Sequence, residues 1–341
     1  MTSLTPTPTP APRRRHARLR RTVVVLTLGA STVLAGCGLG TAGGFSPTGT
    51  LAGPLANVPS LEGATLAVGS KDFTEQILLG KIMVILLQSA GADVVDYTNI
   101  PGSASSRQAQ VEGQVDVSWE YTGTAWISYL GETDPIPDEQ EQFDAVRDLD
   151  AERYDLVWLK PAPMNNTYAF AATSAKAAEL GVEDLSDLVD VPAADRTFCV
   201  EAEFAARNDG FQPMLQTYGL TYGQDVTSAQ VRIMTAGAIY AATAAGECTF
   251  GEVFTTDGRI KALDLAVLTD SENFFPKYNV SAVLGAQVLE DNPQLRDLIE
   301  PVTDALDDET LVELNARVDV DGQEPTDVAY AWLQEAGFIT G

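Results

Sequence analysis

Short apolar runs typical of β-strands alternate with helical runs along this chain, and that alternation limits its fold more than any other feature. The first strand is predicted at residues 64–68, and the helix after it has apolar residues at helical spacing from Ile77 to Leu86. Repeated strand and helix units predict a parallel sheet with helices on its faces. The sequence therefore predicts the α/β fold class.

The alternation continues to the C-terminal end and suffices for two α/β bodies. Further strands are predicted at residues 94–99, 115–119, 167–173, 196–200, 231–235, 266–268 and 280–283. Helices are predicted between most of them and at residues 294–304, 308–319 and 325–336. Two such bodies suit a two-lobed protein that binds its ligand in a cleft at the interface of the lobes.

The N-terminal segment has the features of an export signal. Six arginines precede an apolar run from Thr22 to Leu34, which is too short to span a bilayer. The residues Leu34-Ala35-Gly36-Cys37 that follow resemble the lipobox of bacterial lipoproteins, in which the cysteine is joined to diacylglycerol. We expect a signal peptide over residues 1–36, a lipid anchor on Cys37 and a location outside the cell membrane. An ordinary secretory peptide would give the same compartment.

Composition restricts the partners of the exported chain. Residues 37–60 are rich in Gly, Pro, Ser and Thr, which predicts a flexible tether. Loss of residues 1–36 removes six arginines and no acid, so the net charge falls from -27 to -33. Such a chain would repel nucleic acid and anionic lipid, and both are excluded as partners.

Two cysteines remain after Cys37, namely Cys199 and Cys248. An even pair in an oxidising compartment is most simply a disulfide, which would close a loop within one sub-domain. The alternative is two separate buried thiols, since neither the spacing nor the flanking residues require contact.

Most catalytic chemistry is missing from the chain. The one histidine, His16, belongs to the export signal, so the exported protein has no imidazole for a catalytic triad or a zinc site. No phosphate-binding loop or dinucleotide fingerprint occurs, and we expect neither a cofactor nor a metal. Carboxylates are plentiful, which leaves an extracellular hydrolase that uses two of them as an alternative.

Aromatic and cationic residues follow several predicted strands, where open α/β sheets bind ligands. The motifs are Gly69-Ser70-Lys71-Asp72-Phe73-Thr74-Glu75-Gln76, Glu120-Tyr121-Thr122-Gly123-Thr124, Thr256-Asp257-Gly258-Arg259 and Phe274-Phe275-Pro276-Lys277-Tyr278. In this order they resemble the substrate-binding proteins of osmoprotectant ABC transporters, which bind glycine betaine, carnitine or choline. The resemblance covers residues 64–336.

The resemblance implies a type II periplasmic-binding-protein fold without enzymatic activity. It places residues 61–165 and 276–341 in lobe 1 and residues 166–275 in lobe 2. It also implies an aromatic cage, because a quaternary ammonium group donates no hydrogen bond and is recognised through the faces of aromatic rings. The implied cage residues are Tyr121, Tyr168, Phe254 and Tyr278.

The resemblance also implies a site for a ligand carboxylate, made by Lys71, Arg207 and Thr124. Glu203 precedes Arg207 by four residues, so on a helix it would share a face with Arg207 and orient it. Two positions depart from the family pattern. Phe254 stands where full cages have tyrosine, and Asn166 stands where some members have an acid.

The expected partners are a small quaternary ammonium solute and a membrane permease driven by a separate ATPase, with the protein itself a monomer. The less polar wall at Phe254 leaves ergothioneine or a bulkier betaine as an alternative ligand. A sensory module that regulates a separate receptor is a further alternative to transport.

Overall fold

The computed structural model describes residues 46–134 and 136–341. The predicted signal peptide, residues 1–36, and the predicted lipidation site Cys37 lie outside this part. Among the described residues, no helix combines the length and the apolar character that a membrane span needs.

Five strands form the first sheet, in the order β3-β2-β4-β11-β5. They are β2 (Thr65–Lys71), β3 (Asp93–Ile100), β4 (Val117–Tyr121), β5 (Leu156–Pro161) and β11 (Val280–Gly285). Strand β2 runs parallel to β3 and β4, whereas β11 is antiparallel to both of its neighbours. The first sheet and its helices are called the first lobe below.

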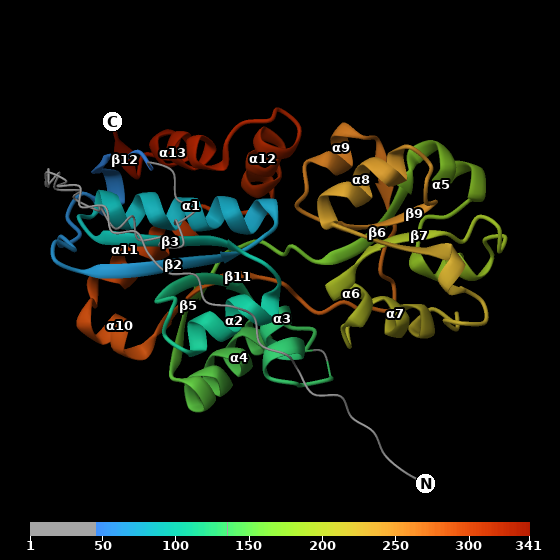
Figure 1. The fold of residues 1–341 in the computed structure, drawn as a ribbon, viewed down its shortest axis with the longest axis horizontal. Coiled ribbons are helices and arrows are strands. Elements are labelled where there is room, and N and C mark those ends of the chain that lie inside the picture. Colours follow the sequence, from blue (N-terminus) through green and yellow to red (C-terminus); the bar gives the residue numbers. More distant parts are fainter. Residues whose placement is uncertain (1–45, 135) are drawn as a thin grey trace, which may run out of the picture. The chain divides into compact units, whose positions relative to one another are not determined.

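Helix α1 (Thr74–Ser89) is buried on nearly all sides, which explains its apolar sequence. It packs on the first sheet and against α12 (Asp308–Asp319) and α13 (Pro325–Glu335). Lys81, a charge within the apolar run, is held by Asp96 of β3 with Nζ and Oδ2 2.5 Å apart. Helices α2 (Ser103–Val111) and α4 (Glu139–Tyr154) lie on the other side of the sheet (Figure 1).

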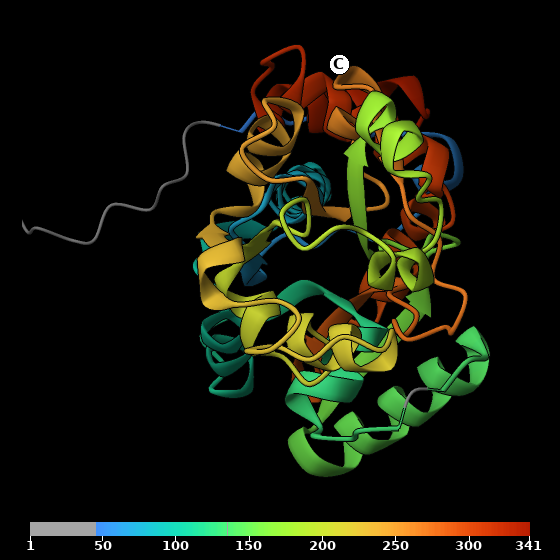
Figure 2. The same ribbon diagram turned by 90° about the vertical axis from the view of Figure 1, so that its right-hand side faces the viewer.

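The second sheet has the order β10-β6-β9-β7-β8, and with its helices it forms the second lobe. Its strands are β6 (Tyr168–Thr173), β7 (Phe198–Glu201), β8 (Val231–Met234), β9 (Phe250–Phe254) and β10 (Leu265–Val267). Alternate residues of β6 point to opposite faces, so Phe170 packs on one side and Ala171 on the other. Figure 2 turns this lobe toward the viewer.

Helices cover both faces of the second sheet. Helix α8 (Ala236–Ala244) contributes to the clusters on the Ala171 face. Helices α5 (Ser174–Leu180), α6 (Ala202–Ala206) and α7 (Phe211–Thr217) contribute to the cluster on the Phe170 face. Apolar burial on both faces is the arrangement that strand and helix alternation predicts, and the α/β fold class is confirmed.

Two segments connect the sheets and touch each other. Residues 162–167 lead from β5 to β6, and residues 268–279 lead from β10 to β11. The Asn279 side chain donates to the Met164 carbonyl at 2.7 Å, and the Tyr278 amide donates to Asn165 Oδ1 at 2.7 Å. The predicted lobe boundaries, at 165/166 and 275/276, fall within these two connections.

The expectation of a flexible tether through residue 60 is wrong for its second half. Strand β1 (Thr50–Leu51) pairs with β12 (Ile339–Thr340), and the side chains of Leu55 and Leu61 are buried in the core of the first lobe. Glycine, proline, serine and threonine are frequent in this segment, but a few leucines fix it to the body. The burial of a few apolar side chains is therefore enough to order a segment whose composition suggests flexibility.

Cys199 of β7 and Cys248 are joined by a disulfide, with their Cα atoms 5.7 Å apart. Both residues are buried against Ile239 of α8. The bond lies entirely within the second lobe. In the chain-entropy model a loop of this length stabilises the folded state by about 4 kcal/mol.

Candidate ligand-binding site

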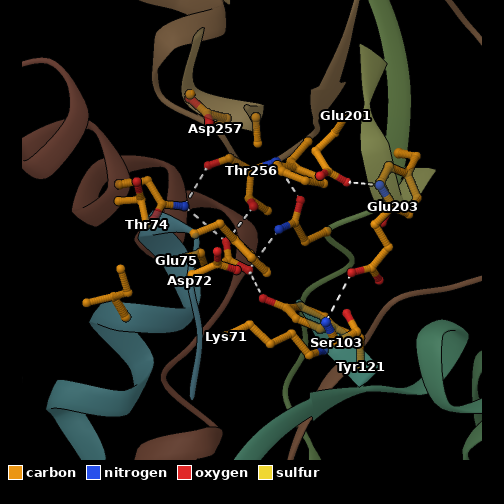
Figure 3. Close-up of a pocket in the computed structure, with 18 of the residues that line it drawn as sticks. Lys71, Asp72, Thr74, Glu75, Ser103, Tyr121, Glu201, Glu203, Thr256 and Asp257 are labelled. Atoms are coloured by element: carbon orange, nitrogen blue, oxygen red, sulfur yellow. Dashed lines mark hydrogen bonds between the residues drawn. The ribbon is translucent and has the colours of Figure 1, made fainter. Parts of the chain in front are cut away.

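A pocket of about 490 Å³ lies between the two sheets and is lined by residues of both lobes (Figure 3). The first lobe contributes the turn from β2 into α1 and the residues that end β4. The second lobe contributes the ends of β6, β7 and β9, and the connecting segments add Asn166 and Tyr278. These are the strand ends at which the sequence motifs were noted.

Five aromatic rings line the pocket: Phe73, Tyr121, Tyr168, Phe254 and Tyr278. Phe73 of the first lobe stacks on Phe254 of the second, with ring centroids 5.3 Å apart. The Tyr168 ring lies 5.4 Å from Phe254 and meets Tyr278 edge-on at 5.4 Å. Rings from both lobes and from a connecting segment thus meet around one space, which is the arrangement that surrounds a diffuse cation.

Two motif glycines are needed for this close packing. A Cβ atom on Gly123 would lie 2.6 Å from the Lys277 carbonyl oxygen and 2.8 Å from the Tyr278 ring. A Cβ atom on Gly258 would lie 2.5 Å from Ala316 of α12. The absence of a side chain on Gly123 lets the segment of Lys277 and Tyr278 lie close to the end of β4. In the same way Gly258 lets α12 lie close to the turn after β9.

Glu75 is a buried carboxylate that receives hydrogen bonds from four parts of the chain. Oε1 accepts from the Tyr121 hydroxyl at 2.6 Å and from Asn166 Nδ2 at 2.8 Å. Oε2 accepts from the Thr256 hydroxyl at 2.5 Å and from Asn315 Nδ2 at 3.0 Å. Glu75 therefore links α1 to β4, to the first connecting segment, to the turn after β9 and to α12.

All four donors to Glu75 are neutral. Burial raises the pKa of Glu75, and the hydrogen bonds from Thr256, Tyr121, Asn315 and Asn166 only partly oppose this effect. Among the described residues, no lysine or arginine lies within ion-pair distance of the Glu75 carboxylate. No cation therefore compensates a charge on Glu75 in the wall of the pocket, and its raised pKa favours the neutral form.

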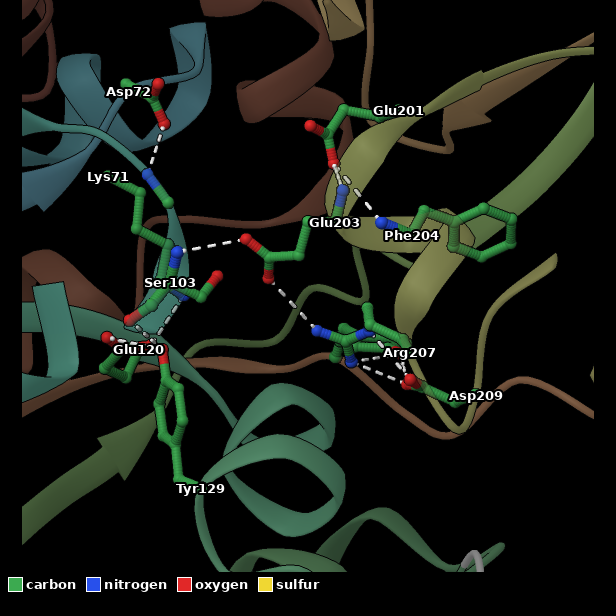
Figure 4. A network of polar contacts seen from close by, with 12 residues as sticks. Lys71, Asp72, Ser103, Glu120, Tyr129, Glu201, Glu203, Phe204, Arg207 and Asp209 are labelled. Carbon is green, nitrogen blue, oxygen red and sulfur yellow. Dashed lines mark hydrogen bonds and ion pairs between the residues drawn. The ribbon is translucent and has the colours of Figure 1, made fainter. Parts of the chain in front are cut away.

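Lys71, by contrast, is already paired. Its ammonium group lies 2.6 Å from Glu120 Oε2, and the two side chains are 3% and 0% exposed. The Tyr129 hydroxyl donates to Glu120 at 3.2 Å, and the Lys71 ammonium lies 5.0 Å from the centre of the Tyr121 ring. Figure 4 shows Lys71, Glu120 and Tyr129 beside Ser103.

Arg207 lies behind the pocket rather than in its wall. Its guanidinium donates to Asp209 through Nε at 2.7 Å and through Nη2 at 2.6 Å, and Nη2 also donates to the Tyr278 hydroxyl at 3.2 Å. Its central carbon lies 5.3 Å from the centre of the Tyr168 ring. Arg207 thus supports two of the pocket's rings from behind while Asp209 neutralises its charge.

Glu203 connects the lobes directly. Its Oε2 accepts a hydrogen bond of 3.0 Å from the Ser103 amide, at the N-terminus of α2, where the helix dipole favours an anion (Figure 4). Its Oε1 lies 3.6 Å from Arg207 Nη1. Although burial opposes it, the hydrogen bonding to Ser103 holds the pKa of Glu203 below its ordinary value.

Most of the side chains singled out from the sequence come together in this pocket. Its lining includes Lys71, Tyr121, Thr124, Asn166, Tyr168, Glu203, Phe254 and Tyr278. Arg207 is the exception. Helix α6 ends one residue before it, so the expected shared helical face with Glu203 does not form, although the two side chains are still neighbours.

Three residues that matter to the geometry were not singled out: Phe73, Glu75 and Glu120. All three lie inside motifs that the sequence displayed, and Phe73 and Glu75 flank the start of α1. Their position at a strand end was the available signal. The described residues contain no cluster of His, Cys, Asp and Glu that could hold a metal ion.

Comparison with known proteins identifies the family. A model described as the substrate binding domain of ABC-type glycine betaine transport systems matches residues 64–335. The chain belongs to this family. The substrate-binding domains of the family act outside the cytoplasm as solute-binding proteins and not as enzymes, so the hydrolase alternative is wrong.

Relatives of known name extend the same conclusion. The glycine-betaine-binding protein of Pseudomonas aeruginosa is 40% identical over 279 residues, which cover 80% of this chain and 88% of that protein. The ergothioneine transport permease/ergothioneine binding protein EgtU of Helicobacter pylori is 29% identical, over 84% of this chain and 51% of that protein.

The fold also matches solved structures of the family. A crystal structure of a glycine betaine/carnitine/choline ABC transporter protein superposes with a TM-score of 0.65 at 26% identity, covering 80% of this chain and 97% of that one. The two-sheet architecture is the type II periplasmic-binding-protein fold. Both the fold and the family that the motifs implied are confirmed.

Proposed function

We propose that this protein is a lipid-anchored receptor that binds glycine betaine or a related quaternary ammonium compound and delivers it to an ABC permease. The cage would consist of the predicted residues Tyr121, Tyr168, Phe254 and Tyr278, together with Phe73. The observation that carries the proposal is the convergence of these five rings on one pocket. Each well-placed ring contributes about 0.5–2 kcal/mol to the binding of a desolvated cation.

The same geometry explains how binding would be signalled to a permease. Phe73 and Phe254 belong to different lobes, and Glu203 reaches from α6 to the N-terminus of α2. A ligand held between the rings would contact both lobes and so favour the closed arrangement over an open one. The permease would then recognise the closed arrangement. This step is binding alone and involves no chemical reaction.

Ergothioneine, which carries a trimethylammonium group and, unlike glycine betaine, a heterocyclic ring, is a second candidate. Two observations favour it: the similarity to EgtU and the apolar wall that Phe254 provides. Phe254 offers a ring face without a hydroxyl, and a pocket of about 490 Å³ is within the size range of small-molecule sites.

Isothermal titration with glycine betaine, choline, carnitine and ergothioneine tests the proposal, with glycine as the control that lacks the methyl groups. We expect saturable heat with at least one trimethylammonium compound and none with glycine. Tyr168→Leu should weaken the binding of every such compound, because the Tyr168 ring touches both Phe254 and Tyr278. Heat with none of the four would contradict the proposed function.

The anchor is tested separately. Cys37→Ser should move the protein from the membrane fraction to the soluble extracytoplasmic fraction and remove the lipid mass from its N-terminal peptide. An unlipidated N-terminus in the unchanged protein would contradict the anchor and leave the solute-binding role intact.

A further inference from the structure

We propose that the two lobes close by docking the turn of residues 256–259 in the second lobe on one face of α12 in the first lobe. Gly258 makes this docking sterically possible. The turn follows β9 and is one of the motifs noted in the sequence, but the proposed cage does not include it. The inference goes beyond the proposed function by naming the closing contact, and it rests on that function only where it predicts ligand affinity.

The turn meets the first lobe through three different contacts. The residues of α12 that it touches are three or four positions apart, share one face of the helix, and are Asn315, Ala316 and Asp319. Asn315 Nδ2 donates to the Thr256 carbonyl at 3.1 Å. Gly258 packs on Ala316, and Arg259 Nη2 lies 3.2 Å from Asp319 Oδ2. A hydrogen bond, a close packing contact and an ion pair therefore join the lobes along one helix face.

The packing contact depends on the absence of a side chain at Gly258. A Cβ atom there would lie 2.5 Å from Ala316 Cβ and 2.7 Å from Ala316 Cα, and its three nearest atoms beyond the chain neighbours all belong to Ala316. Gly258 itself has φ -63° and ψ -21°, which any residue adopts, so its own turn does not require glycine. A methyl group at position 258 should therefore hold the lobes apart and leave each lobe intact.

The ion pair is built so that it can break and reform. Within the second lobe, Arg259 Nε donates to Asp257 at 2.9 Å. Within the first lobe, Asp319 accepts from the Thr74 hydroxyl at 2.7 Å. Each charged group therefore keeps a partner in its own lobe when the lobes separate. Burial raises the pKa of Asp319, and the Arg259 guanidinium acts against this rise.

Docking also sets the two cage rings that face each other across the lobes. The Phe254 amide donates to the Tyr240 hydroxyl at 2.9 Å, and the Arg259 guanidinium lies 4.1 Å from the centre of the Tyr240 ring. In the first lobe, Asp319 is bonded to the residue that follows Phe73. The pair of Arg259 and Asp319 thus connects the supports of both rings, and lobe closure is coupled to the stacking of Phe73 on Phe254.

Small-angle X-ray scattering of the soluble Cys37→Ser protein tests the docking without any ligand. Gly258→Ala should enlarge the radius of gyration, because the turn can no longer reach α12. Gly285→Ala is the matched control. Gly285 also precedes a short helix, α10 (Ala286–Asp291), with φ -61°, and the nearest atom to a Cβ there, beyond the chain neighbours, lies 3.5 Å away. The control should have the radius of gyration of the wild type.

Titration calorimetry with choline and with glycine betaine measures the consequence for binding. When only a fraction of the molecules can close, the apparent affinity for every ligand falls by that fraction. Gly258→Ala should therefore weaken both compounds by the same factor, about ten-fold or more, which corresponds to about 1.4 kcal/mol. Asp319→Asn loosens the contact from the first lobe and should weaken both about two- to five-fold. Thermal unfolding of both variants should stay cooperative.

The outcomes separate the closing contact from the proposed function. An unchanged radius of gyration in Gly258→Ala, or affinities equal to those of the wild type, would overturn the inference and leave the proposed function standing. A loss confined to one of the two compounds would show that the turn acts by touching the ligand, and would also overturn it. Binding of neither compound by the wild type would contradict the proposed function, and the scattering comparison would still decide the docking. Asp319→Asn decides it if Gly258→Ala does not fold.

Discussion

Glu75 and Glu120 are both buried glutamates of the first lobe, yet their surroundings give them opposite electrostatic effects. Glu120 faces the Lys71 ammonium and the Tyr129 hydroxyl, so its charge is cancelled within the protein. Glu75 faces two amides and two hydroxyls, which satisfy its oxygens but bring no opposing charge, and burial raises its pKa. Hydrogen bonds to a buried carboxylate therefore do not by themselves compensate its charge. Only a neighbouring cation, such as Lys71 beside Glu120, does so.

The largest effect should come from breaking the compensated pair. Glu120→Gln leaves the Lys71 ammonium buried without a counter-charge, and we expect the free energy of unfolding to fall by about 3–5 kcal/mol. Urea denaturation measures it. The double variant Lys71→Met, Glu120→Leu should recover most of the loss because no charge remains. A loss below about 1 kcal/mol in the single variant would show that Lys71 does not depend on Glu120.

A second carboxylate beside Glu75 should have the next largest effect. Asn166→Asp turns a donor 2.8 Å from Glu75 Oε1 into a repelling acceptor, and we expect a loss of about 1–3 kcal/mol at neutral pH that shrinks in acid. Asn165→Asp is the matched control, since the side-chain oxygen of Asn165 accepts from the Tyr278 amide and an aspartate oxygen can do the same. Equal losses in the two variants would contradict the role of Glu75.

The pH dependence of stability should distinguish the two glutamates. Burial raises the pKa of Glu75 above its ordinary value of 4.5, so the folded state holds a proton that the unfolded chain has lost. The free energy of unfolding should therefore fall as the pH rises from 4.5 through the raised pKa, by at most about 1.4 kcal/mol per unit. Glu75→Gln should lack this contribution. The free energy of unfolding is measured by urea denaturation at several pH values. The same dependence on pH in the wild type and in Glu75→Gln would contradict the raised pKa of Glu75.

The smallest effect should come from removing one ring of the pocket, and it should appear in ligand affinity. Phe73→Leu removes a ring that stacks on Phe254, and we expect quaternary ammonium affinity to fall about two- to five-fold, or roughly 0.5–1 kcal/mol. Calorimetric titration measures it. Phe274→Leu serves as control, because the Phe274 ring packs on Phe275 away from the pocket lining. An equal effect in the control would mean that Phe73 acts through packing alone.

The fold could be predicted where periodicity was strong. Helix α12 has the bounds that the apolar spacing predicted. Helix α4 was missed because its exposed face is charged and few apolar residues, Phe143, Val146 and the partly buried Leu149, anchor it in the core. Strand β9 was missed because Gly251 and the buried Glu252 interrupt its apolar pattern. The sequence pattern predicts a helix or strand only when the buried positions of that helix or strand carry apolar residues at regular spacing.

The site was predictable to the level of motifs. Strand-end motifs brought the aromatic residues together, but they could not show which charges would cancel. Glu75 was named only as part of a motif, and its partners Thr256 and Asn315 lie 181 and 240 residues away in the chain. Lys71 was expected to meet a ligand, and Glu120 meets it instead. Pairing of this kind depends on tertiary contact, which residue spacing does not encode.

The interior place of β11 in the first sheet, between β4 and β5, restricts the order in which the chain can fold. Strand β11 separates β4 from β5, so the first sheet stays incomplete until residues 280–285 have been synthesised. The second sheet takes all its strands from residues 168–267, and the Cys199–Cys248 bond closes within it. Pairing between distant strands is slow because loop closure comes before the gain from contact. When the chain emerges from its N-terminus, the middle of the protein can therefore be completed before its beginning.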